Sequence, residues 1–188
     1  MASELAQPTS RLFLGLGIPP ATTSELLELE QEIAGARWQT AEQLHLTLHF
    51  LGNQPESLVG PLIAALQGLK FAAFDLQVNG AGCFVNQRSP SILWAGVSAC
   101  EGLWVLHRQT ADCLGRLGLP SESRPWRPHV TLARLPRRAK APQGFIEAHA
   151  RMHLPAFNVR EFCLYQSHAT PAGSRYQVLQ QFAATAPD

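Results

Sequence analysis

Residues 44–48, with the sequence Leu-His-Leu-Thr-Leu, recur 84 positions later as Pro-His-Val-Thr-Leu at residues 128–132. Each copy holds a histidine and a threonine two residues apart, and both are flanked by aliphatic residues. Because alternate residues of a strand point to the same face, each copy presents an imidazole beside a hydroxyl. Two such strands in one chain predict a fold built from two similar halves.

A second pair of segments supports this prediction. Phe74-Asp75-Leu76 resembles Phe157-Asn158-Val159, and these segments lie 83 positions apart. Two matches at nearly the same offset indicate an internal duplication, with two lobes facing each other about a pseudo-two-fold axis. The chain of 188 residues, 46% hydrophobic and 15% charged, is long enough to bury such a core. We expect one domain over residues 1–188, made of two intertwined lobes.

The residues of 44–51 alternate, which is typical of a strand with one buried face. Leu44, Leu46, Leu48 and Phe50 are predicted to share the core face, and His45, Thr47 and His49 the opposite face; Gly52-Asn53 is expected to end the strand. The same patterns predict strands over 11–18, 37–39, 74–78, 92–97, 129–135, 157–166 and 176–182. They predict helices from Ser24 to Gly35, over 55–69, over 101–117 and near 145–150. Residues 81–89 are predicted to connect two strands.

The net charge of +1 argues against a protein that coats a long polyanion. A nucleic-acid partner is therefore expected at an end or in a small pocket. Basic residues nevertheless gather between 124 and 140, a segment without acidic residues: Arg124, Arg127, Arg134, Arg137, Arg138 and Lys140. Arg134 follows His129 by five residues, so it is predicted to reach the same phosphate. Arg137, Arg138 and Lys140 are predicted to form a solvated basic loop.

The cysteines and histidines show no pattern typical of a metal site. Cys83, Cys100, Cys113 and Cys163 form no C-x-x-C pair, so we expect buried free thiols in a reducing compartment and a cytoplasmic protein. His49 follows His45 by four residues, but a strand does not bring such a pair together, and no acidic residue completes a ligand set. We predict no metal and place His49 at the edge of the cleft. Trp126 is a candidate cleft residue, and His107, His149, His153 and His168 are predicted to be surface or structural residues.

No apolar stretch approaches the length of a membrane span, and residues 1–11 lack the apolar core of a signal peptide. We therefore expect no membrane partner. The sequence also lacks a phosphate-binding G-x-x-x-x-G-K loop and a G-x-S-x-G nucleophile motif. The paired histidines are thus the main candidates for chemistry.

Two imidazoles in one cleft can divide the proton transfers of a phosphodiester hydrolysis. A neutral ring takes a proton from water and a protonated ring gives one to the departing alkoxide, each worth roughly 10²–10⁴ in rate. The two threonine hydroxyls can donate hydrogen bonds to an anionic oxygen between them. This scheme requires no cofactor.

These segments resemble the 2H phosphoesterases, which are bilobal proteins defined by two His-x-Thr/Ser motifs. More narrowly, the chain resembles the bacterial and archaeal RNA 2′,3′-cyclic phosphodiesterases, once called 2′-5′ RNA ligases. The similar segments are Arg11–Leu14, Leu44–Gly52, His129–Arg134, Phe162–Ser167 and Gly173–Tyr176. The resemblance implies an α+β fold with two pseudo-symmetric lobes, each a mainly antiparallel sheet with helices, and a cleft between them.

The resemblance also implies hydrolysis of a terminal RNA 2′,3′-cyclic phosphate to a 2′-phosphomonoester. It makes His45 the proton donor and His129 the proton acceptor, with Thr47, Thr131 and Arg134 on the phosphate. Phe50 would stack on a base, a role that requires a bulge or twist in its strand. The implied partners are RNA ends or small nucleotides with a 2′,3′-cyclic phosphate, and we expect a monomer.

Two alternatives stay open at this point. One keeps the chemistry but acts on small cyclic nucleotides, 2′-5′ oligonucleotides or an ADP-ribose-derived cyclic phosphate. The other is a module that binds RNA ends with little catalysis. A reverse reaction that joins 2′-5′ ends is also implied by the family.

Overall fold

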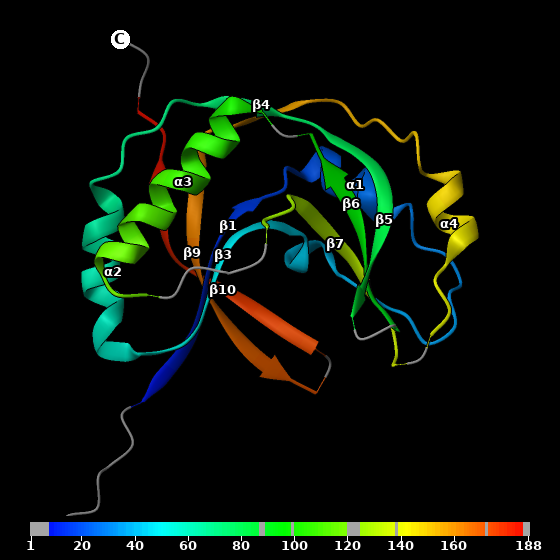
Figure 1. The fold of residues 1–188 in the computed structure, drawn as a ribbon, viewed down its shortest axis with the longest axis horizontal. Coiled ribbons are helices and arrows are strands. Elements are labelled where there is room, and N and C mark those ends of the chain that lie inside the picture. The colour runs from blue at the N-terminus through cyan, green and yellow to red at the C-terminus, as the bar shows by residue number, and fades with distance from the viewer. Residues whose placement is uncertain are drawn as a thin grey trace, which may run out of the picture.

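The computed structural model describes residues 8–86, 89–98, 100–119, 125–137, 139–171 and 173–185. Figure 1 shows the arrangement of the elements. The strands are β1 (Thr9–Gly17), β2 (Arg37–Trp38), β3 (His45–Pro55), β4 (Phe74–Leu76), β5 (Val78–Asn86), β6 (Ser89–Val97), β7 (His129–Arg134), β8 (Phe157–Val159), β9 (Glu161–Thr170) and β10 (Gly173–Ala183). The helices are α1 (Pro20–Leu27), α2 (Val59–Gln67), α3 (Glu101–Arg116) and α4 (Gln143–Ala148), with 3-10 turns η1 (Ala41–Gln43) and η2 (Glu56–Leu58).

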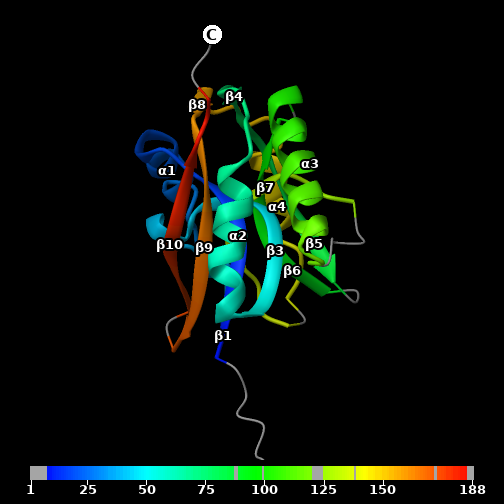
Figure 2. The same cartoon turned by 90° about the vertical axis from the view of Figure 1, so that its left-hand side faces the viewer.

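The main sheet runs in the order β10-β9-β1-β3-β7-β6-β5, with β2 paired to β7. All of these strand pairs are antiparallel. Helices α2 and α3 lie beside β9, β1 and β3, and α4 packs against β5 (Figure 1), whereas α1 contacts η1. Figure 2 shows α2 and α3 in front of β1 and β3, so these helices cover one face of that part of the sheet. The predicted α+β class is confirmed.

Equivalent positions of the two halves pair with each other where the halves meet. The β3–β7 pairing consists of Leu46 with Val130, residues that lie 84 positions apart. In the separate β4–β8 ribbon, Asp75 pairs with Asn158, and the Asn158 side chain donates to the Asp75 carboxylate at 2.8 Å. Pairing of equivalent residues is what a two-fold axis requires. The internal duplication stays a prediction, and both pairings support it.

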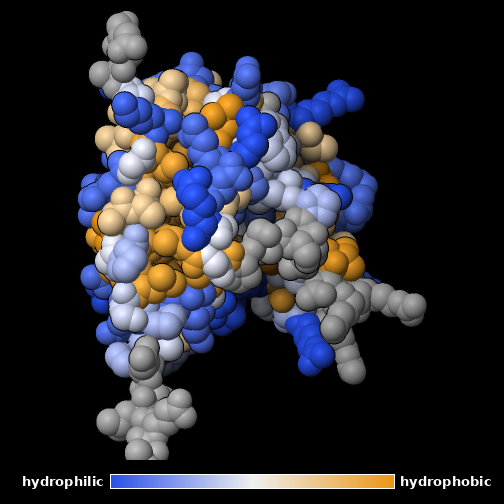
Figure 3. Space-filling view, turned by 60° about the vertical axis from the view of Figure 1, so that its left-hand side comes forward, coloured by the Kyte–Doolittle hydropathy of each residue, from blue (hydrophilic) through white to orange (hydrophobic). Residues whose placement is uncertain are grey.

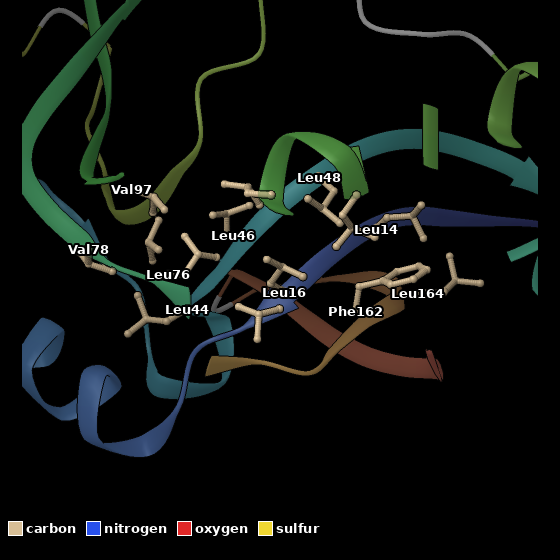
Figure 4. Packing of buried hydrophobic residues seen from close by; sticks show 14 of the residues in the cluster. Leu14, Leu16, Leu44, Leu46, Leu48, Leu76, Val78, Val97, Phe162 and Leu164 are labelled. Carbon is tan, nitrogen blue, oxygen red and sulfur yellow. The ribbon is translucent and has the colours of Figure 1, made fainter. Parts of the chain in front are cut away.

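The core lies between the sheet and its helices and is continuous across both halves. Figure 4 shows leucines of β1 and β3 packed with residues of β4, β5, β6 and β9. Fully buried members include Leu14, Leu46, Leu93, Val130 and Phe162. Each such side chain contributes about 1.5–3 kcal/mol on burial, so the shared core holds the two halves in a fixed relation.

Three predicted elements are wrong. Helix α1 begins at Pro20, not Ser24, because proline is well suited to the first turn of a helix, and it ends at Leu27. Strand β3 continues past Gly52, which adopts a φ of 70° beside an irregularity in the β1–β3 pairing. The predicted connection over 81–89 is largely strand β5. Gly82 serves packing there, since a Cβ at this position would overlap the Trp94 ring.

The surface seen in Figure 3 is mixed, with small hydrophobic patches among hydrophilic side chains. Two of the four cysteines, Cys113 and Cys163, are buried, while Cys83 and Cys100 are partly exposed, and all four are free thiols. Among the described residues, no helix is long and apolar enough to cross a membrane.

Candidate active site

A bulge in β3 sets which side chains lie beside His45. Thr47 pairs with Gly15 and His49 pairs with Leu14, so Leu48 has no partner in β1. An extra residue of this kind reverses the alternation that follows it. Leu48 and His49 are therefore both buried.

Phe50 lies beyond this bulge and is 52% exposed. Its ring centroid lies 6.1 Å from that of Phe13, which in turn lies 4.8 Å from the His45 ring. The prediction that Phe50 faces the core is wrong, because the bulge shifts the alternation by one residue. Phe50 instead joins the face that carries His45 and Thr47.

Strand β7 carries the same bulge at the equivalent place. Trp94 of β6 pairs with Thr131 and Leu93 pairs with Ala133, so Leu132 has no partner. As in β3, two consecutive buried residues follow the threonine, and the next residue, Arg134, is exposed. Under strict alternation, the side chains of His129 and Arg134 would project from different faces of the sheet. The bulge brings both side chains to one face. The two copies thus match in backbone irregularity as well as in sequence.

The register of the central pair brings the four motif side chains together. Leu46 pairs with Val130 in antiparallel fashion, and extending this register by one residue on each side sets His45 opposite Thr131 and Thr47 opposite His129. The leucine and valine are buried, so their neighbours project from the other face. Each histidine is therefore beside the threonine of the other copy.

Both histidine rings are oriented by the same kind of backbone contact. His45 Nδ1 lies 2.7 Å from the Gln43 carbonyl oxygen, and His129 Nδ1 lies 2.7 Å from that of Arg127. A carbonyl only accepts hydrogen bonds, so each Nδ1 carries the proton and donates it. In the neutral rings Nε2 is then the acceptor, and the Thr47 hydroxyl lies 3.0 Å from Nε2 of His45. Proton transfer to or from a ligand would use Nε2 in both copies.

Aromatic side chains surround the His45 ring and remove it from water. Phe13 lies against it at 4.8 Å, and Tyr176 meets it edge-on at 5.0 Å. Burial is the main reason that the pKa of His45 falls from 6.5 to about 4, and the charges on His129 and Arg134 lower it further. The contact with the Gln43 carbonyl acts in the opposite direction. The electrostatic influence of His129 and Arg134 on His45 indicates that the two motifs lie close to each other.

The His129 ring is also contacted by an aromatic side chain. Phe84 of β5 meets its ring edge-on at 4.8 Å, and Phe84 also packs against Trp94 at 5.3 Å. Phe84 lies in the segment that the sequence pattern left as a connection, so its place beside the second histidine was not predicted. A hydrophobic residue in a glycine-containing strand gave no local signal for this role.

The predicted place of His49 at the cleft edge is wrong. Its ring is buried on the opposite face from His45, with Nε2 at 2.9 Å from Thr110 Oγ1 and 3.0 Å from the His107 carbonyl oxygen. It also stacks on the His107 ring at 4.3 Å. His45 and His49 therefore do not form a metal-binding pair. Burial, followed by the charge on His49, lowers the pKa of His107 to about 4.

Trp126 contacts both β3 and α3. Its indole nitrogen donates to the Thr47 carbonyl oxygen at 3.1 Å, and its ring stacks on His107 at 3.9 Å. A backbone carbonyl left without a strand partner thus gains a donor. Trp126 contacts the first motif through its backbone, and it links this motif to α3.

The basic segment over residues 124–140 is only partly described. Arg127, Arg134, Arg137 and Lys140 are exposed. Arg124 and Arg138 lie outside the described residues. One further arginine was missed: Arg37 of β2 pairs directly with Arg134. No sequence motif marks Arg37, because its position depends on pairing between distant strands.

The site thus holds two imidazoles, two hydroxyls and an arginine on one face of a sheet. Groups of three or more histidine, cysteine or acidic residues placed to bind a metal do not occur among the described residues. This set of side chains can exchange protons through two Nε2 atoms and donate hydrogen bonds to an anion between them.

Comparison with known proteins identifies a family of phosphoesterases. The family described as "LigT like Phosphoesterase" matches twice, over residues 16–94 and 97–176. The RNA 2′,3′-cyclic phosphodiesterase of Archaeoglobus fulgidus is 27% identical over 92% of this chain and 99% of its own length. The enzyme of that name from Thermus thermophilus is 30% identical over 92% of this chain and 89% of its own.

Solved structures share the fold. A Thermus thermophilus protein of known crystal structure is 29% identical with a TM-score of 0.76, covering 92% of this chain and 97% of that one. LigT of E. coli, crystallised with 3′-AMP, is 25% identical with a TM-score of 0.78, covering 95% of this chain and 100% of that one. The resemblance to the 2H phosphoesterases is confirmed, and this chain belongs to the LigT-like phosphoesterase family.

Proposed function

We propose that this protein hydrolyses the terminal 2′,3′-cyclic phosphate of RNA and leaves a 2′-phosphomonoester. The observation that carries this proposal is the equivalent orientation of His45 and His129. In each ring, Nδ1 contacts the carbonyl oxygen of the residue two positions earlier. Nε2 of each ring is therefore the nitrogen left to exchange a proton with a ligand. Curated relatives named RNA 2′,3′-cyclic phosphodiesterase support the choice of substrate.

The reaction divides into two proton transfers around one phosphorus atom. His129 Nε2 accepts a proton from water as the water oxygen bonds to phosphorus. The bond between phosphorus and O3′ breaks, and O3′ takes a proton from Nε2 of His45. The products are a 2′-phosphate and a free 3′-hydroxyl. Proton exchange with solvent restores both rings, and the scheme includes no metal or cofactor.

The remaining site residues act on the phosphate and the terminal base. Thr47 and Thr131 donate hydrogen bonds to the non-bridging oxygens, and Arg134 supplies a charge-assisted contact. In the free protein the Thr47 hydroxyl lies against His45 Nε2, so the substrate replaces this contact. Phe50 is exposed on the same face and can stack on the terminal base.

The donor role of His45 requires that the substrate change its charge state. With a pKa of about 4, the ring is neutral at pH 7 in the free protein. An anionic phosphate beside His45 favours the protonated ring and offsets the charges of His129 and Arg134. We therefore expect binding to raise the pKa of His45 toward neutrality.

The proposal is tested with RNA that ends in a 2′,3′-cyclic phosphate. His45→Ala and His129→Ala are each expected to lower kcat by at least 100-fold, as for loss of a general acid or base. His153→Ala is the matched control, because this exposed histidine lies outside the site. Activity is expected to persist in excess EDTA, with only 2′-phosphate formed.

Three results would contradict the proposal: full activity of either histidine variant, strict dependence on a metal ion, or a 3′-phosphate product. Binding without turnover in the wild-type protein would favour an RNA-end-binding module. The monomeric state and the cytoplasmic location stay predictions.

A further inference from the structure

Two arginines face each other on adjacent strands next to the site. Arg37 of β2 and Arg134 of β7 are paired in register, so their side chains share one face of the sheet. Like charges directly opposite each other destabilise a strand pair. Among the described residues neither guanidinium forms an ion pair with a carboxylate, and both side chains are exposed. An anion bound between them would relieve this repulsion.

The arginines line a small open depression of about 60 Å³, whose other lining residues are Trp38, Gln39, Gln43, Gly173 and Ser174. Gln39, Gln43 and Ser174 are the polar uncharged residues of the lining, and no acidic residue is among them. The Gln43 amide donates to the Ser174 carbonyl oxygen at 2.6 Å, which joins η1 to the start of β10. The lining carries two positive charges and no negative charge, which favours the binding of an anion.

The depression adjoins the reaction centre through three connections. The backbone carbonyl of Gln43 holds Nδ1 of His45, while its side chain lines the depression. Arg134 lines the depression, and its charge lowers the pKa of His45. Tyr176 follows Ser174 by two residues and contacts the His45 ring. The depression therefore lies next to the residues that hold and surround His45.

We propose that this depression binds a second phosphate, the phosphodiester on the 5′ side of the terminal nucleotide, with Arg37 as its main ligand. The inference rests on the proposed function, in which Arg134 contacts the cyclic phosphate and so lies between the two subsites. RNA ends carry this second phosphate, and a cyclic mononucleotide with a 5′-hydroxyl does not. Arg37 thus selects RNA ends over small cyclic nucleotides.

The test compares two substrates and two charge-matched variants. The substrates are a 2′,3′-cyclic mononucleotide with a 5′-hydroxyl and a dinucleotide with the same cyclic end. Arg37→Gln removes the proposed ligand, and Arg108→Gln removes an exposed charge from α3, which packs against the opposite face of β3. Thermal unfolding verifies that both variants are folded.

The wild-type protein is expected to favour the dinucleotide about tenfold in kcat/KM, a difference of about 1.4 kcal/mol. Arg37→Gln is expected to abolish this preference while leaving the mononucleotide rate within about twofold, and Arg108→Gln is expected to retain it. Higher salt is expected to weaken the preference in the wild-type protein, since the contact is ionic.

The subsite is refuted if the wild-type protein shows no preference, or if Arg37→Gln lowers both rates equally. Turnover of neither substrate would refute the proposed function instead. In that case calorimetric binding of a dinucleotide with a terminal 2′-phosphate decides the subsite. Affinity about tenfold weaker in Arg37→Gln supports it, and equal affinity refutes it.

Discussion

His45 is expected to titrate far below an ordinary histidine in the free protein. Burial is the main cause of the fall in its pKa from 6.5 to about 4, and the charges of His129 and Arg134 add to it. The unfolded chain binds this proton more readily, so the free energy of unfolding rises with pH across this window. The contribution of the neutral ring is fully present above pH 6.5 and is lost as the pH falls through about 4.

The size of the effect follows from the two pKa values. At roughly 1.36 kcal/mol for each pH unit, the full loss is about 3 kcal/mol, and about 2.5 kcal/mol of it is gone at about pH 4.5. Urea unfolding of the wild-type protein and of His45→Gln at pH 7.5 and 4.5 measures this difference. We expect the variant to lose about 2.5 kcal/mol less than the wild-type protein on acidification. Histidine resonances followed by NMR give the pKa directly, with the variant assigning His45.

An equal acid-induced loss in the two proteins, or an NMR midpoint near 6.5, would refute the reasoning about burial. The same titration with saturating 2′-AMP tests the donor role. We expect the pKa of His45 to rise toward neutrality as the phosphate binds. An unchanged midpoint in the complex would instead favour His45 as the proton acceptor.

Two further predictions concern packing around the first motif. A Cβ at Gly15 would lie 2.9 Å from the Leu46 carbonyl oxygen, so Gly15→Ala is expected to cost about 1–3 kcal/mol and to lower kcat. Gly115→Ala, in the last turn of α3, is its control, because nothing lies within 4 Å of a Cβ there and little change in stability is expected. Equal unfolding free energies of the two variants would contradict the argument. Trp126→Phe keeps an aromatic ring but removes the donor to the Thr47 carbonyl, and urea unfolding is expected to show a loss of about 1 kcal/mol. No measurable change in stability or kcat would show that this contact does not position the motif.

Much of the fold was accessible from local patterns. The apolar runs predicted most strands, because a strand with one buried face alternates and the core requires those side chains. Strand β5 was missed because its glycines resemble a turn, although Gly82 makes room for Trp94 across the sheet. Packing of this kind between two strands cannot be predicted from the sequence of either strand alone.

Local sequence patterns also predicted part of the candidate site. His45, Thr47, His129 and Thr131 were identified because the motif is doubled, and a packing role alone does not explain two identical spacings. The faces of Phe50 and His49 were wrong, because a bulge depends on register with β1. Arg134 was predicted as a phosphate ligand from its distance along the chain, yet it reaches the face of His129 only through the bulge at Leu132.

The sequence by itself determined the family of this protein, and it predicted the candidate site of two histidines and two threonines in matched strands. The tertiary structure decided which way each side chain faces, that both rings are held at Nδ1, and that Arg37 joins Arg134. It also decided the low pKa of His45, which results from burial by β1 and β10. Periodicity is a property of neighbouring residues, whereas register, bulges and desolvation arise only when distant segments pack together.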